Sequence, residues 1–131
     1  ELLAGLSLRG TTTDWKLWRT PHVSLIFQSD RGDPKSGTVW LDDRRGPRRN
    51  QRPDAAATGL SLPLWLRIER DGKLYVGKVS RDGKNWQKIG VIDGPERSLP
   101  RHLYVGMLAG SDSNHPTRVA VDDVSIFDHS K

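Results

Sequence analysis

The stretch that decides the fold is Leu64–Trp86, with the sequence LWLRIERDGKLYVGKVSRDGKNW. It holds two Asp-Gly pairs, at positions 71-72 and 82-83, and each pair lies between apolar runs. An Asp-Gly pair in this setting is a strong hairpin signal, because glycine readily takes the positive φ of a type I′ turn and aspartate tolerates it. Two such turns in succession predict an antiparallel meander of three strands, Leu64–Arg70, Lys73–Ser80 and Asn85–Gly90.

The alternation of apolar and polar residues predicts further strands on both sides of the meander. These strands cover Leu2–Arg9, His22–Gln28, Thr38–Asp42, His102–Ala109 and Thr117–Phe127. In the last strand the apolar positions change parity at Asp122-Asp123, which predicts a β-bulge there. No stretch has sustained helical periodicity, so the sequence predicts an all-β antiparallel sandwich or barrel of about eight short strands.

The domain organisation follows from length and from one long gap in the strand pattern. A chain of 131 residues predicts a single domain, 1–131, that buries a core without disulfide or metal staples. Because the chain opens directly on a strand, which leaves an edge uncovered, we expect the natural domain to begin earlier. Residues 43–62 are rich in arginine, proline and alanine and lack strand periodicity, so we predict a long loop that is functional or mobile.

Composition narrows the classes of function. The chain has no cysteine, which excludes a disulfide framework and thiolate chemistry, and no apolar run approaches the roughly 18 residues of a membrane span. The net charge of +5 favours acidic partners. Five of the arginines fall close together, at Arg44, Arg45, Arg48, Arg49 and Arg52.

This arginine cluster has two interpretations. Guanidinium groups hold oxyanions through paired hydrogen bonds, so the cluster suits phosphates, sulfates or uronates. The alternative is a solvated loop without a ligand. No aromatic residue lies among these arginines to stack on bases, so we expect an acidic polysaccharide or another protein rather than nucleic acid.

The residue patterns of catalysis are missing. A glycoside hydrolase needs two carboxylates about 5 to 10 Å apart. The chain has only three glutamates, and Glu69 is followed by Gly72-Lys73 where a second glutamate would be needed. There is no Gly-x-Ser-x-Gly elbow and no glycine-rich phosphate loop, so we expect no enzymatic activity.

Metal binding has a weak signal in pairs of acidic residues. Asp122 and Asp123 supply the oxygen donors that a structural calcium ion prefers. The alternative is that Asp122 bonds backbone groups at the predicted bulge. We expect no other cofactor.

Three blocks of sequence carry a resemblance to a known family. They are Trp65–Ile68 with the meander up to Trp86, then Tyr104–Met107, then Val121–Ile126. In this order and spacing they resemble the bacterial concanavalin A-like lectin and glucanase domains, which are laminin-G-like sandwiches. The resemblance implies a two-sheet jelly roll with further strands before Leu3, in an extracellular or cell-envelope protein. It implies carbohydrate recognition or an accessory role, without naming a ligand.

The tryptophans indicate where a ligand would bind. Trp65 and Trp86 lie in the family-like blocks and are predicted to serve the sandwich, with Trp86 packed over the second Asp-Gly turn. The remaining tryptophans lie in a polar loop or on the strand face opposite to Val39 and Leu41, and aromatic faces of this kind stack on sugar rings. With their polar neighbours they give the candidate ligand-binding residues Trp15, Trp18, Trp40, Asp42, Arg44 and Arg45. The alternative is that Trp40 faces the core in place of Val39 and Leu41.

The sequence therefore predicts a non-catalytic binding module within a larger bacterial protein, with a carbohydrate, acidic glycans included, as its ligand. The rival hypothesis is a structural or protein-interaction domain without a sugar site. The two differ in whether Trp15, Trp18 and Trp40 are available at the surface.

Overall fold

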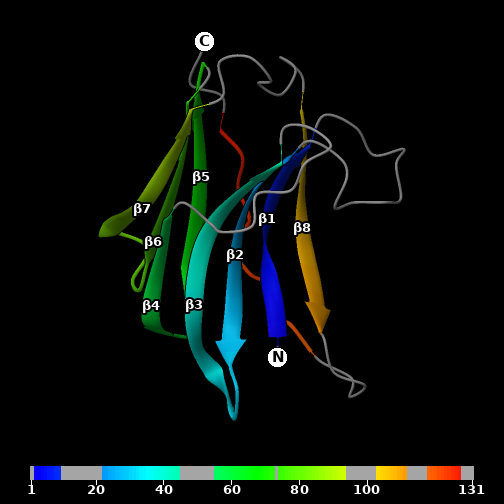
Figure 1. Cartoon of the computed structure of the whole chain (residues 1–131), viewed down its shortest axis with the longest axis vertical. Helices are drawn as coiled ribbons and strands as arrows, with labels where there is room; N and C mark the ends of the chain where they lie inside the picture. Colours follow the sequence, from blue (N-terminus) through cyan, green and yellow to red (C-terminus); the bar gives the residue numbers. More distant parts are fainter. Residues whose placement is uncertain are drawn as a thin grey trace.

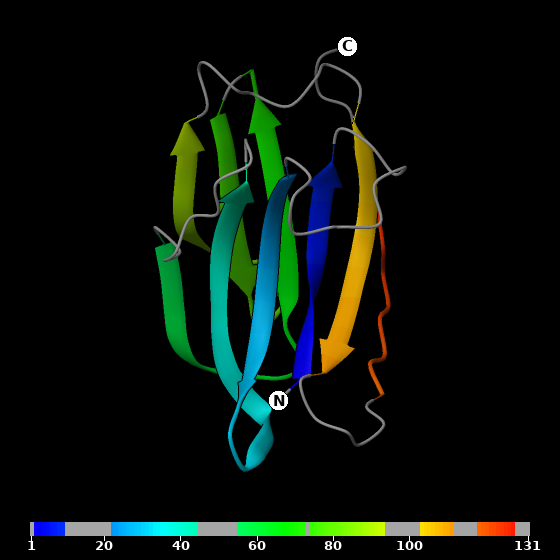
Figure 2. The ribbon, with the colours of Figure 1, turned by 45° about the vertical axis from the view of Figure 1, so that its right-hand side comes forward.

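The computed structural model describes residues 2–9, 22–44, 55–72, 74–93, 103–111 and 118–127. Within them the chain is all-β, and two antiparallel sheets face each other as a β-sandwich (Figures 1 and 2). The strands are β1 Leu2–Arg9, β2 His22–Asp30, β3 Asp33–Arg44, β4 Ala55–Ser61, β5 Trp65–Asp71, β6 Leu74–Ser80, β7 Trp86–Asp93 and β8 Tyr104–Ser111. None of the described segments is a helix that could cross a membrane.

The two sheets differ in width. Sheet A has the strand order β4-β3-β2-β1-β8, and sheet B has the order β5-β6-β7. Sheet B is the predicted meander, so the alternating pattern around the two Asp-Gly pairs is confirmed. Strand β5 packs against β1 and β2, and β7 packs against β3 and β4, so that sheet B covers only part of sheet A.

The core lies between the sheets and is built from alternate residues. Val39 and Leu41 on β3 are buried, at 0% and 1% exposure, and they face Tyr75 and Val79 of β6. Trp40 has the opposite parity and lies on the outer face of sheet A. The prediction that Val39 and Leu41 share the inner face is confirmed, and the alternative with Trp40 in the core is wrong.

The two sheets approach closely at Gly77 in the middle of β6. A Cβ atom at this position would lie 3.0 Å from Leu25 Cδ1 and 3.1 Å from Leu41 Cδ1. Both leucines belong to the fully buried part of sheet A. A side chain at position 77 would force both leucine side chains to shift, so glycine suits the place where β6 crosses β2 and β3.

The two Asp-Gly turns differ from the prediction in detail. Gly72 and Gly83 have φ of 58° and 76°, which confirms the expected positive φ. However, Ser80 pairs with Trp86, so five residues separate β6 from β7 and the second connection is not a two-residue turn. The longer loop forms because the carboxylate of Asp82 accepts hydrogen bonds from the backbone N–H groups of Lys84 and Asn85, both at 2.8 Å.

The predicted loop over residues 43–62 is partly wrong. Strand β3 continues to Arg44, and β4 occupies Ala55–Ser61. The sequence of β4, AAATGLS, has no apolar–polar alternation. This edge strand is held by backbone pairing with β3, and among residues 56–61 only Leu60 is buried in the core. Residues 45–54 lie outside the described part of the chain.

The predicted last strand is also wrong. Residues 118–127 are described but form no strand, and they are drawn as an extended segment (Figure 2). Asp123 has a φ of 53°, and its N–H donates to Asp122 Oδ1 at 2.9 Å. The change of parity therefore comes from a left-handed residue and not from a β-bulge, since there is no strand ladder here to interrupt.

Candidate functional site

The predicted ligand-binding residues are only partly within the described chain. Trp40 and Asp42 lie two positions apart on β3 and therefore share the outer face of sheet A. Arg44 is the last residue of the same strand. Trp15, Trp18 and Arg45 lie outside the described residues, so their grouping with Trp40 stays a prediction.

Trp40 lies in the interior of sheet A, among small and apolar neighbours. It pairs with Ile26 on β2 and with Ala56 on β4, and Ile26 in turn pairs with Gly5 on β1. Directly paired residues project to the same face, so these four positions form one row across the sheet. Trp40 is half-buried and Ala56 is exposed, which leaves part of the indole open to solvent.

A polar row runs beside Trp40. Asp42 pairs with Ser24, which pairs with Ser7, and the two serine hydroxyls are 2.9 Å apart. His22 lies two residues before Ser24, and its Nε2 atom is 3.6 Å from Asp42 Oδ2. The row brings a carboxylate, an imidazole and two hydroxyls next to an indole.

This polar row is not arranged as a nucleophilic triad. Ser24 is 1% exposed and its hydroxyl is engaged with that of Ser7, so no substrate could reach it. His22 is also buried, at 7% exposure. The side chain of Asp42 is more accessible, with 24% of its surface exposed. Asp42 and Trp40 are therefore the members of this face that a ligand can touch.

Sequence reasoning missed Ser7, Ser24 and His22 as neighbours of the site. Each occupies an outward position of an alternating strand, which by itself indicates only solvent exposure. Their grouping depends on the register between β1, β2 and β3, which the residue pattern of one strand does not contain.

The other two described tryptophans lie on the outer face of sheet B. The ring of Trp65 lies against Gly83, where a Cβ atom would be 2.8 Å from Trp65 Cε2. The guanidinium carbon of Arg67 lies 4.0 Å from the centre of the Trp86 ring. The ring nearest to Gly83 is thus that of Trp65, whereas the sequence had assigned the packing over this turn to Trp86.

The acidic residues considered for calcium do not gather. Among the described residues, no group of three histidine, cysteine, aspartate or glutamate side chains is placed to hold a metal ion. Asp122 and Asp123 are exposed, and one oxygen of Asp122 accepts the N–H of Asp123. The local hydrogen bond matches the alternative in which Asp122 serves the backbone.

A comparison of the chain with protein-family models, with curated proteins and with solved structures finds no match. The two outer faces of the sandwich are the features of the described chain that indicate a function.

Proposed function

We propose that this protein is a non-catalytic module that binds a carbohydrate on the outer face of sheet A. Trp40 would stack on the apolar face of a sugar ring, and the carboxylate of Asp42 would accept hydrogen bonds from its hydroxyl groups. The observation that carries the proposal is the outward, half-buried indole of Trp40 beside an accessible carboxylate.

The folding of the sandwich does not require an indole at position 40. The core-facing positions of β3 are filled by Val39 and Leu41, on the other side of the sheet. An aromatic side chain left partly in water adds recognition surface, because it combines a large apolar area with a polar N–H group. The family resemblance over residues 64–127 supports the same class of ligand.

The carboxylates support binding rather than hydrolysis. Glu69 lies on the outer face of sheet B, where it pairs with Lys78 and Arg67. Asp42 lies on the outer face of sheet A. Two catalytic carboxylates must flank one glycosidic bond, and these two cannot, because the whole sandwich lies between them.

A protein-interaction role is the second candidate, and a different part of the molecule favours it. Val105 and Met107 on β8, and Val121 and Ile126 within residues 118–127, are exposed apolar side chains. Apolar side chains grouped at a surface are typical of protein contacts. This role predicts no dependence on Trp40.

The test is a titration of the protein with neutral and acidic oligosaccharides, followed by tryptophan fluorescence and calorimetry. Trp40→Ala is expected to weaken binding at least tenfold, which corresponds to about 1.4 kcal/mol. Tyr104→Ala is the matched control, because Tyr104 is an exposed aromatic residue on the same sheet and on a different strand, β8. Equal affinity of the Trp40→Ala variant, or no binding of any saccharide, would contradict the proposal.

A further inference from the structure

Three basic residues form a row across the outer face of sheet B. Arg67 on β5 pairs directly with Lys78 on β6, and Lys78 pairs directly with Lys88 on β7. Paired residues of antiparallel strands project to the same face, and neighbouring strands are about 4.8 Å apart. The three side chains therefore start side by side on one surface.

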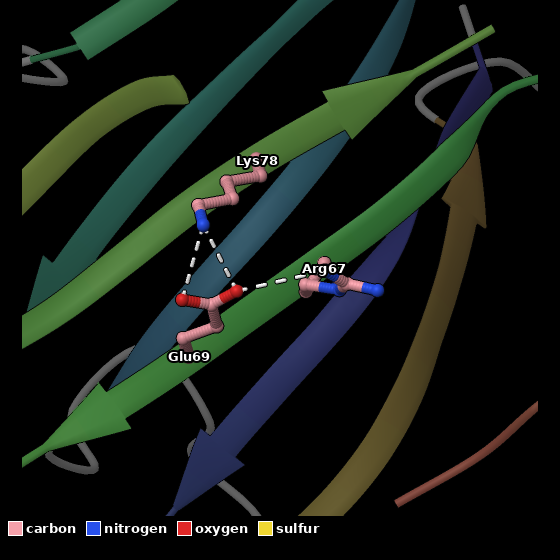
Figure 3. A network of polar contacts seen from close by, with 3 residues as sticks. All are labelled: Arg67, Glu69 and Lys78. Atoms are coloured by element: carbon pink, nitrogen blue, oxygen red, sulfur yellow. Dashed lines mark hydrogen bonds and ion pairs between the residues drawn. The ribbon is translucent and has the colours of Figure 1, made fainter. Parts of the chain in front are cut away.

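This row is unfavourable for the folded protein. Like charges that lie directly opposite each other on neighbouring strands destabilise a sheet. Glu69 relieves part of the repulsion, because its carboxylate accepts hydrogen bonds from Lys78 Nζ at 3.0 and 3.2 Å and lies 3.6 Å from Arg67 Nη1 (Figure 3). Lys88 is exposed, and no ion pair joins it to another described residue. One carboxylate thus neutralises part of the charge of Arg67 and Lys78, and Lys88 has no acidic partner among the described residues.

Two tryptophan side chains lie next to the basic row on the same face of sheet B. Trp65 and Trp86 both pair with Ser80, so they lie on the same face as the basic row. They are two residues away from Arg67 and Lys88 along their strands. The Trp86 ring carries the guanidinium of Arg67 at 4.0 Å, an attraction that fixes the orientation of the cation. One face of the Trp65 ring is covered by Gly83.

The surroundings of the two indoles favour one of two classes of anionic polymer. A protein that binds single-stranded nucleic acid offers open aromatic faces on which bases stack. Here Arg67 covers a face of Trp86 and Gly83 lies against the Trp65 ring, although Trp65 stays 37% exposed, and Arg67 and Lys88 remain at the surface. This arrangement favours the binding of anionic groups over the stacking of bases on the indoles.

We infer that the outer face of sheet B binds an acidic polysaccharide, whose carboxylate or sulfate groups pair with Arg67, Lys78 and Lys88. The spacing of the strands is close to the length of one pyranose unit in an extended chain, so successive acidic groups can meet successive cations. A polyanion would also remove the repulsion within the row. The site lies on the opposite outer face of the sandwich from Trp40 and does not depend on the sugar site there.

The test compares two double variants of the full chain that remove the same charge. Arg67→Gln/Lys88→Gln disrupts the row, and Lys35→Gln/Arg118→Gln removes one exposed lysine and one exposed arginine outside it. The probes are an oligogalacturonate for carboxylates, a heparin oligosaccharide for sulfates, a neutral cello-oligosaccharide and a single-stranded oligonucleotide. The row variant is expected to bind the preferred acidic saccharide at least tenfold more weakly and with a smaller salt dependence, because fewer counterions are exchanged. The control variant should stay within about threefold of the parent, a change of under 1 kcal/mol.

Two further measurements separate this site from structural effects and from the site at Trp40. Lys88→Gln should leave the urea midpoint unchanged or raise it, since it removes a repulsive neighbour of Lys78. Trp40→Ala should keep its affinity for the acidic saccharide. Equal losses in the two double variants, binding to none of the acidic saccharides, or tighter binding of the oligonucleotide would each overturn the inference.

Discussion

The carboxylate of Asp82 organises the loop between β6 and β7. Its Oδ1 atom accepts the N–H groups of Asn85 and Lys84, and its Oδ2 atom accepts the side-chain amide of Asn85 at 2.8 Å. The hydroxyl of Ser80 donates to Oδ1 at 2.9 Å. These hydrogen bonds, the one from the backbone of Asn85 first, hold the pKa of Asp82 well below its ordinary value.

The lowered pKa of Asp82 predicts a specific pH dependence. Because the folded state favours the ionised form, Asp82 stabilises the protein above the ordinary aspartate pKa of about 3.9, and this contribution is lost as the pH falls below it. Asp82→Asn should lower the urea midpoint at pH 7, and the difference from the parent should shrink between pH 5 and pH 2. Asp30→Asn, at the exposed end of β2, is the control. A difference that is constant with pH would contradict this account.

At the scale of elements, alternation predicted the strands that bury one face. The segments β1, β2 and β5 to β7 were found in this way, because their inward residues differ chemically from their outward ones. The edge strand β4 was missed, since backbone pairing requires no pattern of side chains and AAATGLS has no alternation. Residues 118–127 have the apolar residues of a strand, yet alternation says nothing about whether a pairing partner is present.

The close approach at β6 predicts that a side chain at position 77 destabilises the fold. Gly77→Ala places a Cβ atom against Leu25 and Leu41, and overpacking of this kind costs about 1–3 kcal/mol of unfolding free energy. Gly106→Ala on β8 is the matched control, because no atom lies within 4 Å of its added Cβ. Urea unfolding should show a lower midpoint for the first variant alone. Equal stability of both variants would show that the leucine side chains move away without cost.

At the scale of the whole molecule, the unequal widths of the sheets leave part of the inner face of sheet A uncovered. Met107 pairs with Leu6, and Leu6 pairs with Leu25, so the three residues form one core-facing row. Leu25 is 0% exposed, whereas Met107 is 56% exposed. Sequence parity gives the two residues the same role. Only the position of the opposite sheet, which the pattern of a single strand does not encode, separates them.

This asymmetry predicts very different costs for two similar truncations. Leu25→Ala should lower the unfolding free energy by about 2–5 kcal/mol, because it empties a filled core position. Met107→Ala should stay within about 0.5 kcal/mol, as is usual for exposed positions. Chemical denaturation of both variants measures the difference. A large loss for Met107→Ala would mean that β8 is covered on its inner face.

In the candidate site too, some features can be predicted from the pattern of one strand, and others depend on how several strands pair. The outward position of Trp40 follows from the parity of β3 alone. The polar row of Ser7, Ser24 and Asp42 and the basic row on sheet B depend on strand register, which combines residues far apart in the chain. Cross-strand neighbours are therefore the part of the site that sequence reasoning could not supply.

Gly77 also selects one pairing of β6 among its competitors. A slip of β6 by two residues would keep the same face inward, so the apolar pattern alone would accept it. Such a slip would place Tyr75 or Val79 where Gly77 now meets Leu25 and Leu41, at a point where even a Cβ atom would lie 3.0 Å from Leu25 Cδ1. The misaligned sandwich would close only if both leucine side chains moved. The absence of a side chain at position 77 thus favours the native register of β6 over the slipped one.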